Sequence, residues 1–392
     1  MAQYRSFEEH LDPNVGPKRI LSLDGGGLRG VLTLGMLREI EALLRQRHGN
    51  DPNFRLGHYF DLIAGTSTGA IIAAALSLGM TVDQVHGHYL RLGETLFKRS
   101  LFSFGVIDEK YDAASVGKAL KGVFGERTLE SHDFLTGLVV VAKRLDTGSD
   151  WPFSNNPNAK YFNGGTKATT IPNKHYPLWQ VVRASTAAPH YFDPEMIEIG
   201  RAEGAMKPLT GEFVDGGVSP SNNPTLLALM MATMEGYRLG WGVGEKNLQI
   251  VSVGTGKANP EIGLASPFQS ITAVHALRSL TALMEDCADQ VESIMQWLSV
   301  SPTARRINRE MDKAQPVLGG TAMCTYLRYN VLLQPDWLAE RLGETIDSGK
   351  LKALEAMDKP GNIPELDRMG RLAGQRLVKE EHFDPAFCLA AK

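Results

Sequence analysis

Near the start of the chain, the hydrophobic and polar positions follow the same order twice: a short apolar run, a glycine turn and a helical segment. Residues 20–23 form an apolar run before a glycine turn, and apolar side chains spaced three and four apart then predict a helix from about Val31 to Arg47. A second run at residues 60–64 leads through another glycine turn into an apolar segment at 70–76. Strand, helix, strand and helix in succession predict an α/β protein with a mostly parallel sheet.

Later segments add to this pattern. We expect mainly helix over residues 81–135 and 223–239, a short helix at 179–185, a surface excursion at 149–174, and strands at 138–142, 212–214 and 249–253, the last closing the core. From about residue 260 the chain is charged and mostly helical, with one alternating segment at 326–333. We therefore divide the chain into a loosely held polar lead-in (1–18), a catalytic domain (19–258) and a mainly helical region (259–392) that packs on or completes that domain.

Composition narrows the classes of function. Among 392 residues 43% are hydrophobic, the formal net charge is −3, and no long block carries one sign, which argues against a nucleic-acid polymer as partner. The three cysteines have no close spacing, so neither a disulfide framework nor a zinc site is indicated.

The N-terminus has no apolar core of a secretory signal, and we expect a cytoplasmic protein with peripheral membrane contact. The uncharged stretch from Leu62 to Met80 is long enough to span a bilayer, but it contains a glycine turn and is better explained as buried strand, turn and helix.

Candidate chemistry centres on Ser67, which lies in the sequence Gly-Thr-Ser-Thr-Gly between an apolar run and a helical segment. Gly-x-Ser-x-Gly in that setting is the nucleophile-elbow pattern, which exposes a serine hydroxyl on a sharp strand-to-helix turn. A serine hydroxyl needs a base, and Asp215, followed by two glycines at another expected strand end, could serve if burial raises its pKa. A triad would instead need His275 or His382, although neither has a turn signature around it.

The first glycine turn allows two interpretations. Residues 25–30 fit the G-x-G-x-x-G spacing of a dinucleotide site, but the acidic residue that such a site needs is not convincing in either Asp51 or Asp61. As an oxyanion loop, Gly25, Gly26 and Gly27 let backbone N–H groups approach a substrate closely. Arg29 then follows near a helix start, where it could bind an anion or hold the loop.

Residues 24–30, 65–69 and 215–217, in this order and in these settings, resemble the patatin-like phospholipase family. Further matching segments are Phe60–Ala64 and Ala184–Pro189, and the resemblance covers about Arg19 to Gly256. It implies a three-layer α/β/α fold and a Ser–Asp dyad rather than a triad, with Ser67 as nucleophile and Asp215 as base. It further implies an oxyanion loop at residues 25–27 and hydrolysis of glycerolipid acyl esters without a metal or other cofactor.

The resemblance leaves several questions open. An acyltransferase would use the same acyl-enzyme, and a storage or acyl-binding protein would show only incidental esterase activity. Some bacterial relatives are effectors gated by nucleotide second messengers, so a small-molecule activator or a homo-oligomer is also compatible with the chain. Leu101, Phe102 and Phe104 could form an apolar membrane-docking face, although short apolar runs are more often core.

Overall fold

The computed structural model describes residues 3–97, 113–165, 170–189, 191–201, 207–258, 272–307, 310, 312–314 and 317–390. Leu101, Phe102 and Phe104 lie outside these residues, so the proposed docking face is not described. The described residues form one mixed sheet, whose strands are β1 (Lys18–Leu23), β2 (Leu62–Thr66), β3 (Gly137–Arg144), β4 (Ser149–Ser154), β5 (Glu195–Gly200), β6 (Leu209–Asp215), β7 (Leu248–Val253), β8 (Ser299–Val300) and β9 (Cys324–Tyr329).

The strand order is β5-β6-β3-β2-β1-β7-β9-β8, with β4 paired to β3. The pairs from β3 through β2, β1, β7 and β9 to β8 are parallel, whereas β6 runs antiparallel to β3. The register places Leu23 beside Gly65, Thr66 beside Val141, and Ala142 beside Asp215. Because parallel strands end at one edge of the sheet, the first two pairings bring the first glycine turn and Ser67 to the same edge. β6 runs in the opposite direction, but its last residue, Asp215, lies opposite Ala142 and therefore close to the Ser67 turn.

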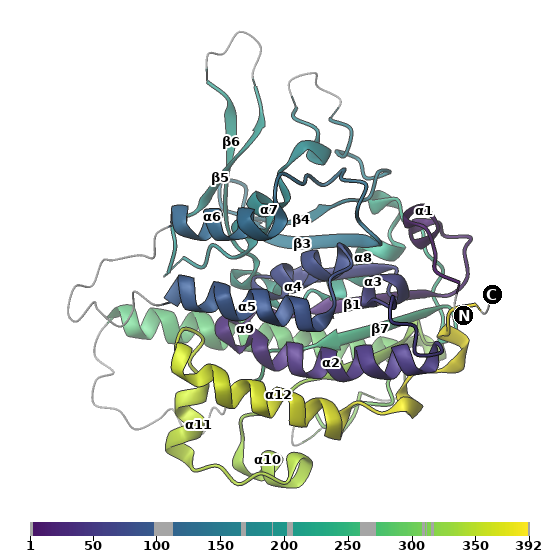
Figure 1. Ribbon diagram of the computed structural model, residues 1–392, viewed down its shortest axis with the longest axis vertical. Coiled ribbons are helices and arrows are strands. Elements are labelled where there is room, and N and C mark those ends of the chain that lie inside the picture. Colours follow the sequence, from purple (N-terminus) through teal and green to yellow (C-terminus); the bar gives the residue numbers. More distant parts are fainter. Residues whose placement is uncertain are drawn as a thin grey trace.

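Helices cover both faces of the sheet, which gives the three-layer α/β/α arrangement (Figure 1). Successive strand residues point to opposite faces, and Ile20 joins one buried cluster while Leu21 joins the other. The larger cluster takes side chains from α2 (Gly30–Arg47), α4 (Thr68–Ser77), α5 (Val82–Phe97), α6 (Ala113–Phe124), α7 (Leu178–Ser185), α10 (Pro335–Leu342), α11 (Ser348–Leu354) and α12 (Ile363–Leu377). The smaller one takes them from α1 (Phe7–Leu11), α8 (Thr225–Thr233) and α9 (Thr272–Leu298).

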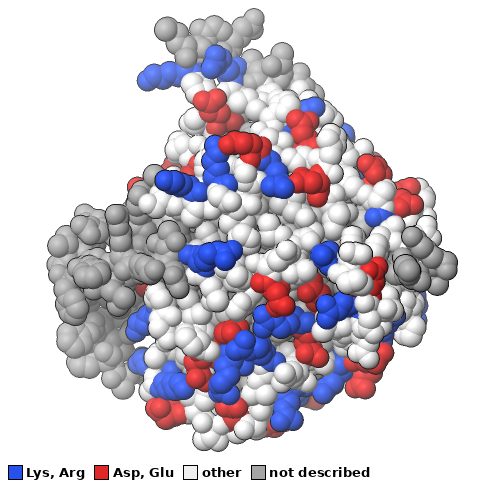
Figure 2. Space-filling model, viewed as in Figure 1, with Lys and Arg blue, Asp and Glu red and all other residues white. Residues whose placement is uncertain are grey.

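Most of the predicted core elements are present, including the helix that begins near Val31 and the strands at 20–23, 138–142 and 249–253. Leu62–Met80 folds as β2, a turn and α4, and no described helix is both long and apolar enough to cross a membrane. In the lower part of Figure 2, where Figure 1 places α12, acidic and basic side chains are intermixed.

Four expectations about elements are wrong. The segment 149–174 contains β4, because the Phe153 ring packs against Phe213 and Tyr176 and outweighs the polar composition around it. The helix expected at 223–239 is reduced to α8, since the chain turns extended at Met234. The strand at 249–253 does not close the core, because β9 lies beyond it.

The fourth concerns the lead-in, which is held rather than loose. Its α1 helix buries His10, and the Asp61 carboxylate accepts hydrogen bonds from Arg5 at 2.6 Å, from the Arg19 backbone at 2.8 Å and from the Arg19 side chain. His10 Nδ1 lies 2.8 Å from the same carboxylate. Burial alone would raise the pKa of Asp61, but the Arg19 guanidinium, the hydrogen bond with His10 and the Arg5 guanidinium hold it well below its usual range. Asp61 is therefore an anchor between the lead-in and β1.

Candidate active site

Ser67 lies in the turn between β2 and α4 with backbone angles φ 55° and ψ −123°. A positive φ is costly for a residue with a Cβ and is found at functional turns such as the nucleophile elbow. Gly69 lets the turn close, because a Cβ there would stand 2.3 Å from the carbonyl oxygen of Leu23 at the end of β1. The Ser67 side chain also lies at the amino end of a ten-residue helix, where the helix dipole favours negative charge.

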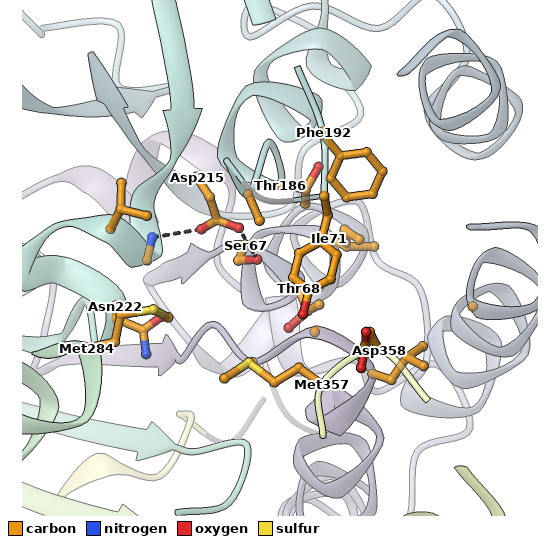
Figure 3. A pocket seen from close by; sticks show the side chains of 18 of the residues that line it. Ser67, Thr68, Ile71, Thr186, Phe192, Asp215, Asn222, Met284, Met357 and Asp358 are labelled. Carbon is orange, nitrogen blue, oxygen red and sulfur yellow. Dashed lines mark hydrogen bonds between the residues drawn. The ribbon is translucent and has the colours of Figure 1, made fainter. Parts of the chain in front are cut away.

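The Ser67 hydroxyl donates a hydrogen bond of 2.6 Å to Oδ2 of Asp215 (Figure 3). The backbone N–H of Gly217 donates to Oδ1 at 2.7 Å, which fixes the carboxylate plane. Asp215 is 5% exposed, and burial raises its pKa from 3.8 to about 6, while the hydrogen bonds from Ser67 and Gly217 act in the opposite direction. A carboxylate with a pKa near the operating pH can take a proton and return it.

A second serine supports the turn from the side. The Ser67 N–H donates to Oγ of Ser185 at 2.9 Å, and the Ser185 hydroxyl donates to the carbonyl of Val141 at 2.5 Å. Ser185 ends α7 and Val141 lies in β3, so these two hydrogen bonds connect the elbow to both elements. These bonds restrict the positions that the Ser67 backbone can adopt.

The three glycines of the first turn differ in their surroundings. The Gly25 N–H donates to the carbonyl of Asn222 at 3.1 Å and is therefore engaged, whereas Gly26 and Gly27 line a cavity in front of Ser67. Gly27 has φ 57°, and a Cβ on it would stand 2.5 Å from the Met357 carbonyl oxygen. The next residue, Leu28, donates its N–H to that same oxygen at 2.7 Å. The loop is thus held from the C-terminal part of the chain.

The cavity has a volume of about 380 Å³, and most of its lining is apolar. In Figure 3 Ser67 and Asp215 point toward each other, with Phe192 and Ile71 to one side of them and Met284 and Met357 to the other. Its apolar lining includes Leu28, Ile71, Leu92, Val116, Leu120, Phe192, Met284 and Met357. Pockets of this size with a few convergent polar groups suit the apolar part of a small ligand.

Arg29 is 3% exposed and does not line this cavity. Its Nε and Nη1 atoms have no hydrogen-bond partner among the described residues, and the nearby carboxylates of Glu285 and Glu355 act on its pKa against the lowering effect of burial. A role for Arg29 in holding the loop therefore agrees better with its position than direct contact with a substrate in this cavity.

The histidines that the sequence offered as a base, and the acids that it offered for a dinucleotide site, are not among the described residues that line the cavity. No histidine is among the described residues that line the cavity; His382 instead lies 3.0 Å from the Tyr329 hydroxyl, and the His275 side chain is not described. Asp61 is used in the anchor of the lead-in, and Asp51 accepts a hydrogen bond from Tyr4 at 2.6 Å. Neither acid lines the cavity beside the glycine turn, as a ribose-binding residue would.

Sequence reasoning missed Asn222, whose carbonyl holds Gly25 and whose buried side-chain Oδ1 has no hydrogen-bond partner among the described residues. It lines the cavity next to Met284 (Figure 3). The available signal was the mostly polar segment Ser219–Asn223, which begins one residue after the glycines that follow Asp215. Polar residues that directly follow a strand end and a glycine turn are frequent in functional sites.

An α/β/α fold with a serine on a strand-to-helix elbow and a buried acid bonded to it is typical of serine acyl hydrolases. Comparison with known proteins gives the family. Residues 21–229 match the family model described as patatin-like phospholipase, and the chain belongs to this family of carboxylic ester hydrolases.

Named relatives include a cUMP-AMP-activated phospholipase of Escherichia coli, 33% identical over 71% of this chain and 77% of the relative. A cGAMP-activated phospholipase of Escherichia coli strain TW11681 is 29% identical over 60% of this chain and 62% of the relative. Patatin group J-1 of Solanum tuberosum is 29% identical over 55% of this chain and 53% of its own length. The chain thus spans less than two thirds of the latter two relatives.

Proposed function

We propose that this protein is a phospholipase A-type lipid acyl hydrolase in which Ser67 is the nucleophile and Asp215 the general base. The observation that carries the proposal is the 2.6 Å hydrogen bond from the Ser67 hydroxyl to Asp215 beside an apolar cavity. No histidine among the described lining residues competes for the role of base. Family membership supports ester hydrolysis as the reaction class.

The reaction proceeds through an acyl-enzyme. Asp215 takes the hydroxyl proton as Ser67 Oγ attacks the ester carbonyl carbon, and the tetrahedral intermediate expels the lysophospholipid oxygen, which receives that proton. Water then attacks the acyl-enzyme and gives a proton to Asp215. Collapse of the second intermediate breaks the bond to Ser67 Oγ, which is reprotonated, and releases a fatty acid.

The negative charge on the carbonyl oxygen needs hydrogen-bond donors. The N–H groups of Gly26 and Gly27 are the candidates, because both residues line the cavity and no described residue accepts a hydrogen bond from either N–H. We do not assign this role to the Gly25 N–H, because it donates to the carbonyl of Asn222. Removal of a single donor of this type costs about 10²- to 10³-fold in rate.

The substrate class follows from the cavity and from the relatives. An apolar lining suits a fatty acyl chain, and a membrane glycerophospholipid supplies both that chain and the ester. Two relatives are named as phospholipases activated by cUMP-AMP or cGAMP, and we extend activation by a cyclic dinucleotide to this chain. Peripheral contact with the bilayer is required for the ester to reach Ser67.

The test measures free fatty acid released from mixed phospholipid vesicles in EDTA, with and without cUMP-AMP or cGAMP. We expect release by the wild type and loss in both Ser67→Ala and Asp215→Ala. Ser149→Ala, in the β3–β4 hairpin, and Asp83→Asn, whose side chain is 71% exposed, are the matched controls and should keep full activity. Circular dichroism of each variant checks that it is folded.

Each departure from this pattern has a distinct meaning. Full activity in folded Asp215→Ala would overturn the dyad and return a histidine to the role of base. Consumption of phospholipid without free fatty acid, with the acyl group transferred to added glycerol, would make the protein an acyltransferase. Labelling of Ser67 by a phosphonate without turnover under any condition would indicate an acyl-binding protein.

A further inference from the structure

A second cavity, of about 550 Å³, lies beyond the carboxyl end of β9 and is lined by residues of the C-terminal third. It is richer in charge than the first cavity. Its lining includes two carboxylates, Glu292 and Glu340, and five cationic side chains, which are Arg305, Arg306, Lys313, Arg328 and Arg341. A cavity with an excess of cationic groups attracts a ligand that carries several negative charges.

Part of this positive charge is not neutralised within the protein. Arg305 pairs with Glu292 at 2.7 Å and with Asp289 at 3.1 Å, whereas Lys313 and Arg341 have no ion pair among the described residues. Exposed cations near a cavity mouth can reach a phosphate without first breaking an internal contact. The unpaired cations therefore mark the side where an anionic group would bind.

Arg328 supplies a buried donor at the same cavity. Its side chain is 5% exposed, and its Nε has no hydrogen-bond partner among the described residues, with the Glu292 carboxylate 3.8 Å away. Buried donors are almost always hydrogen-bonded, so an unbonded one at a cavity wall indicates a place for a ligand oxygen. The other two guanidinium nitrogens are already engaged by Asp24.

Ring systems and an amide complete the lining. Tyr329, Trp337 and His382 all line the cavity, and the Tyr329 and His382 rings lie 5.9 Å apart between centroids. Asn330 lines the cavity and accepts the N–H groups of Gly256 and Val331 at its Oδ1, and its side-chain NH₂ has no acceptor among the described residues. Aromatic faces stack on nucleobases, and an amide can donate to a base edge.

We propose that this second cavity is a nucleotide-binding site that takes a phosphorylated nucleoside, and that its occupancy sets the geometry of the oxyanion loop. The cationic side chains bind the phosphates, and the partly buried Trp337 stacks on a base. Mononucleotides and cyclic dinucleotides share this chemistry, and the experiment separates them. The regulatory half of the proposal rests on the proposed phospholipase function, whereas the binding half does not.

Two short hydrogen-bond paths join the cavity to the oxyanion loop. Arg328 binds both carboxylate oxygens of Asp24, at 2.9 and 2.5 Å, and Asp24 directly precedes Gly25. On the second path Asn330 holds the Gly256 N–H at 2.8 Å, and the adjacent Thr255 donates its hydroxyl to the Gly25 carbonyl at 2.9 Å. A ligand that shifts Arg328 or Asn330 thus acts on the start of the loop through groups already in contact.

Binding is tested with the full chain carrying Ser67→Ala, so that the readout is independent of catalysis. Calorimetric titration with cUMP-AMP, cGAMP, AMP and inorganic phosphate measures each affinity. We expect a nucleotide to bind and both Arg341→Ala and Trp337→Ala to weaken it at least tenfold. Arg376→Ala, an exposed arginine on α12 that does not line the cavity, is the matched control and should bind as the parent does.

Absence of nucleotide binding at millimolar concentration, or affinity unchanged in both cavity variants, would overturn the site. Displacement of bound nucleotide by vesicles of anionic phospholipid but not by neutral ones would instead assign the cavity to a lipid headgroup. Phosphate binding as tightly as the nucleotides would remove the role given to the ring side chains. None of these outcomes depends on fatty acid release.

The coupling is tested with Thr255→Val, which removes one hydroxyl from the second path and nearly preserves side-chain shape. In the background with Ser67 intact, we expect unchanged nucleotide affinity and at least fivefold less nucleotide-stimulated fatty acid release. Stimulation equal to the wild type would refute this path. If no variant, including the wild type, releases fatty acid, the phospholipase proposal fails while the binding result stands.

Discussion

Asp215→Asn should separate the stability of this protein from its activity. The carboxylate of Asp215 is buried beside Ser67, and burial raises its pKa from 3.8 to about 6. A carboxyl group whose pKa is higher in the folded state stabilises folding at low pH, and this contribution is lost as pH rises through the folded pKa. Asparagine keeps the shape of the side chain but has no charge to bury, so it avoids that loss.

The magnitude follows from the two pKa values. A rise from 3.8 to about 6 corresponds to about 3 kcal/mol of stability lost by the wild type at high pH. Part of this loss occurs below pH 5, and linkage places between about 1 and 2 kcal/mol of it between pH 5 and pH 8. The free energy of unfolding of Asp215→Asn, relative to wild type, should therefore increase by that amount across the same range.

Equilibrium urea unfolding at half-unit steps from pH 5 to pH 8 measures this difference. Asp83→Asn is the matched control, because its carboxylate is exposed and folding does not desolvate it. Its difference from wild type should stay flat. A flat difference for Asp215→Asn as well would refute the conclusion that burial dominates the environment of this carboxylate.

The pKa of Asp215 also sets the pH dependence of catalysis. Activity should rise with pH over the range in which stability falls. Only the ionised carboxylate can take the proton of Ser67, so kcat/KM of the wild type should fall about tenfold per pH unit below about 6. Ser67→Ala removes the hydrogen bond that lowers the pKa of Asp215. The pH range over which stability is lost should therefore move upward in this variant.

Three further substitutions, one with a matched control, test the supports of the Ser67 turn and the anchor of the lead-in. Gly69→Ala should abolish activity and lower the urea midpoint, because its Cβ would stand 2.3 Å from a backbone oxygen of β1. The control is Gly122→Ala, which lies in a helix and whose Cβ would have no atom within 4 Å. It should stabilise the protein by about 0.5–1 kcal/mol. Asp61→Asn should lower the free energy of unfolding by about 3–5 kcal/mol, since it leaves a buried arginine without its charge partner; a loss below 1 kcal/mol would contradict this. Ser185→Ala removes a hydrogen bond to the Ser67 backbone worth about 1–2 kcal/mol, and kcat should fall about 5- to 30-fold with the fold intact by circular dichroism.

Local sequence patterns were sufficient to predict the central elements. An apolar run followed by glycines and then by helical spacing is a short-range signal, and it predicted β1, β2 and the turn at Ser67. Asp215 could be proposed as a partner of Ser67 because it lies at an expected strand end before two glycines. The local pattern did not show that β6 runs antiparallel to β3, and it is this pairing, with Asp215 opposite Ala142, that places the acid near Ser67.

Contacts between distant segments could not be predicted in the same way. The engagement of the Gly25 amide depends on a carbonyl 197 positions later in the chain, at Asn222. The buried Arg29 interacts electrostatically with the carboxylates of Glu285 and Glu355, which no local pattern connects with it. In β4, Phe153 is buried only because Phe213 and Tyr176 come to it from other elements.

The oxyanion loop also shows why the family match does not define the catalytic unit. The match ends at residue 229, yet Arg328 holds the start of the loop through Asp24, and the carbonyl of Met357 holds its end through the Leu28 N–H. Both supports come from the C-terminal third, which also adds β9 to the sheet. Because the rate depends on donors held within a few tenths of an ångström, a loop fixed at both ends by this region takes its geometry from it. We therefore infer that the catalytic unit includes the chain to at least Met357, and that a ligand on the C-terminal third can act on catalysis without reaching Ser67.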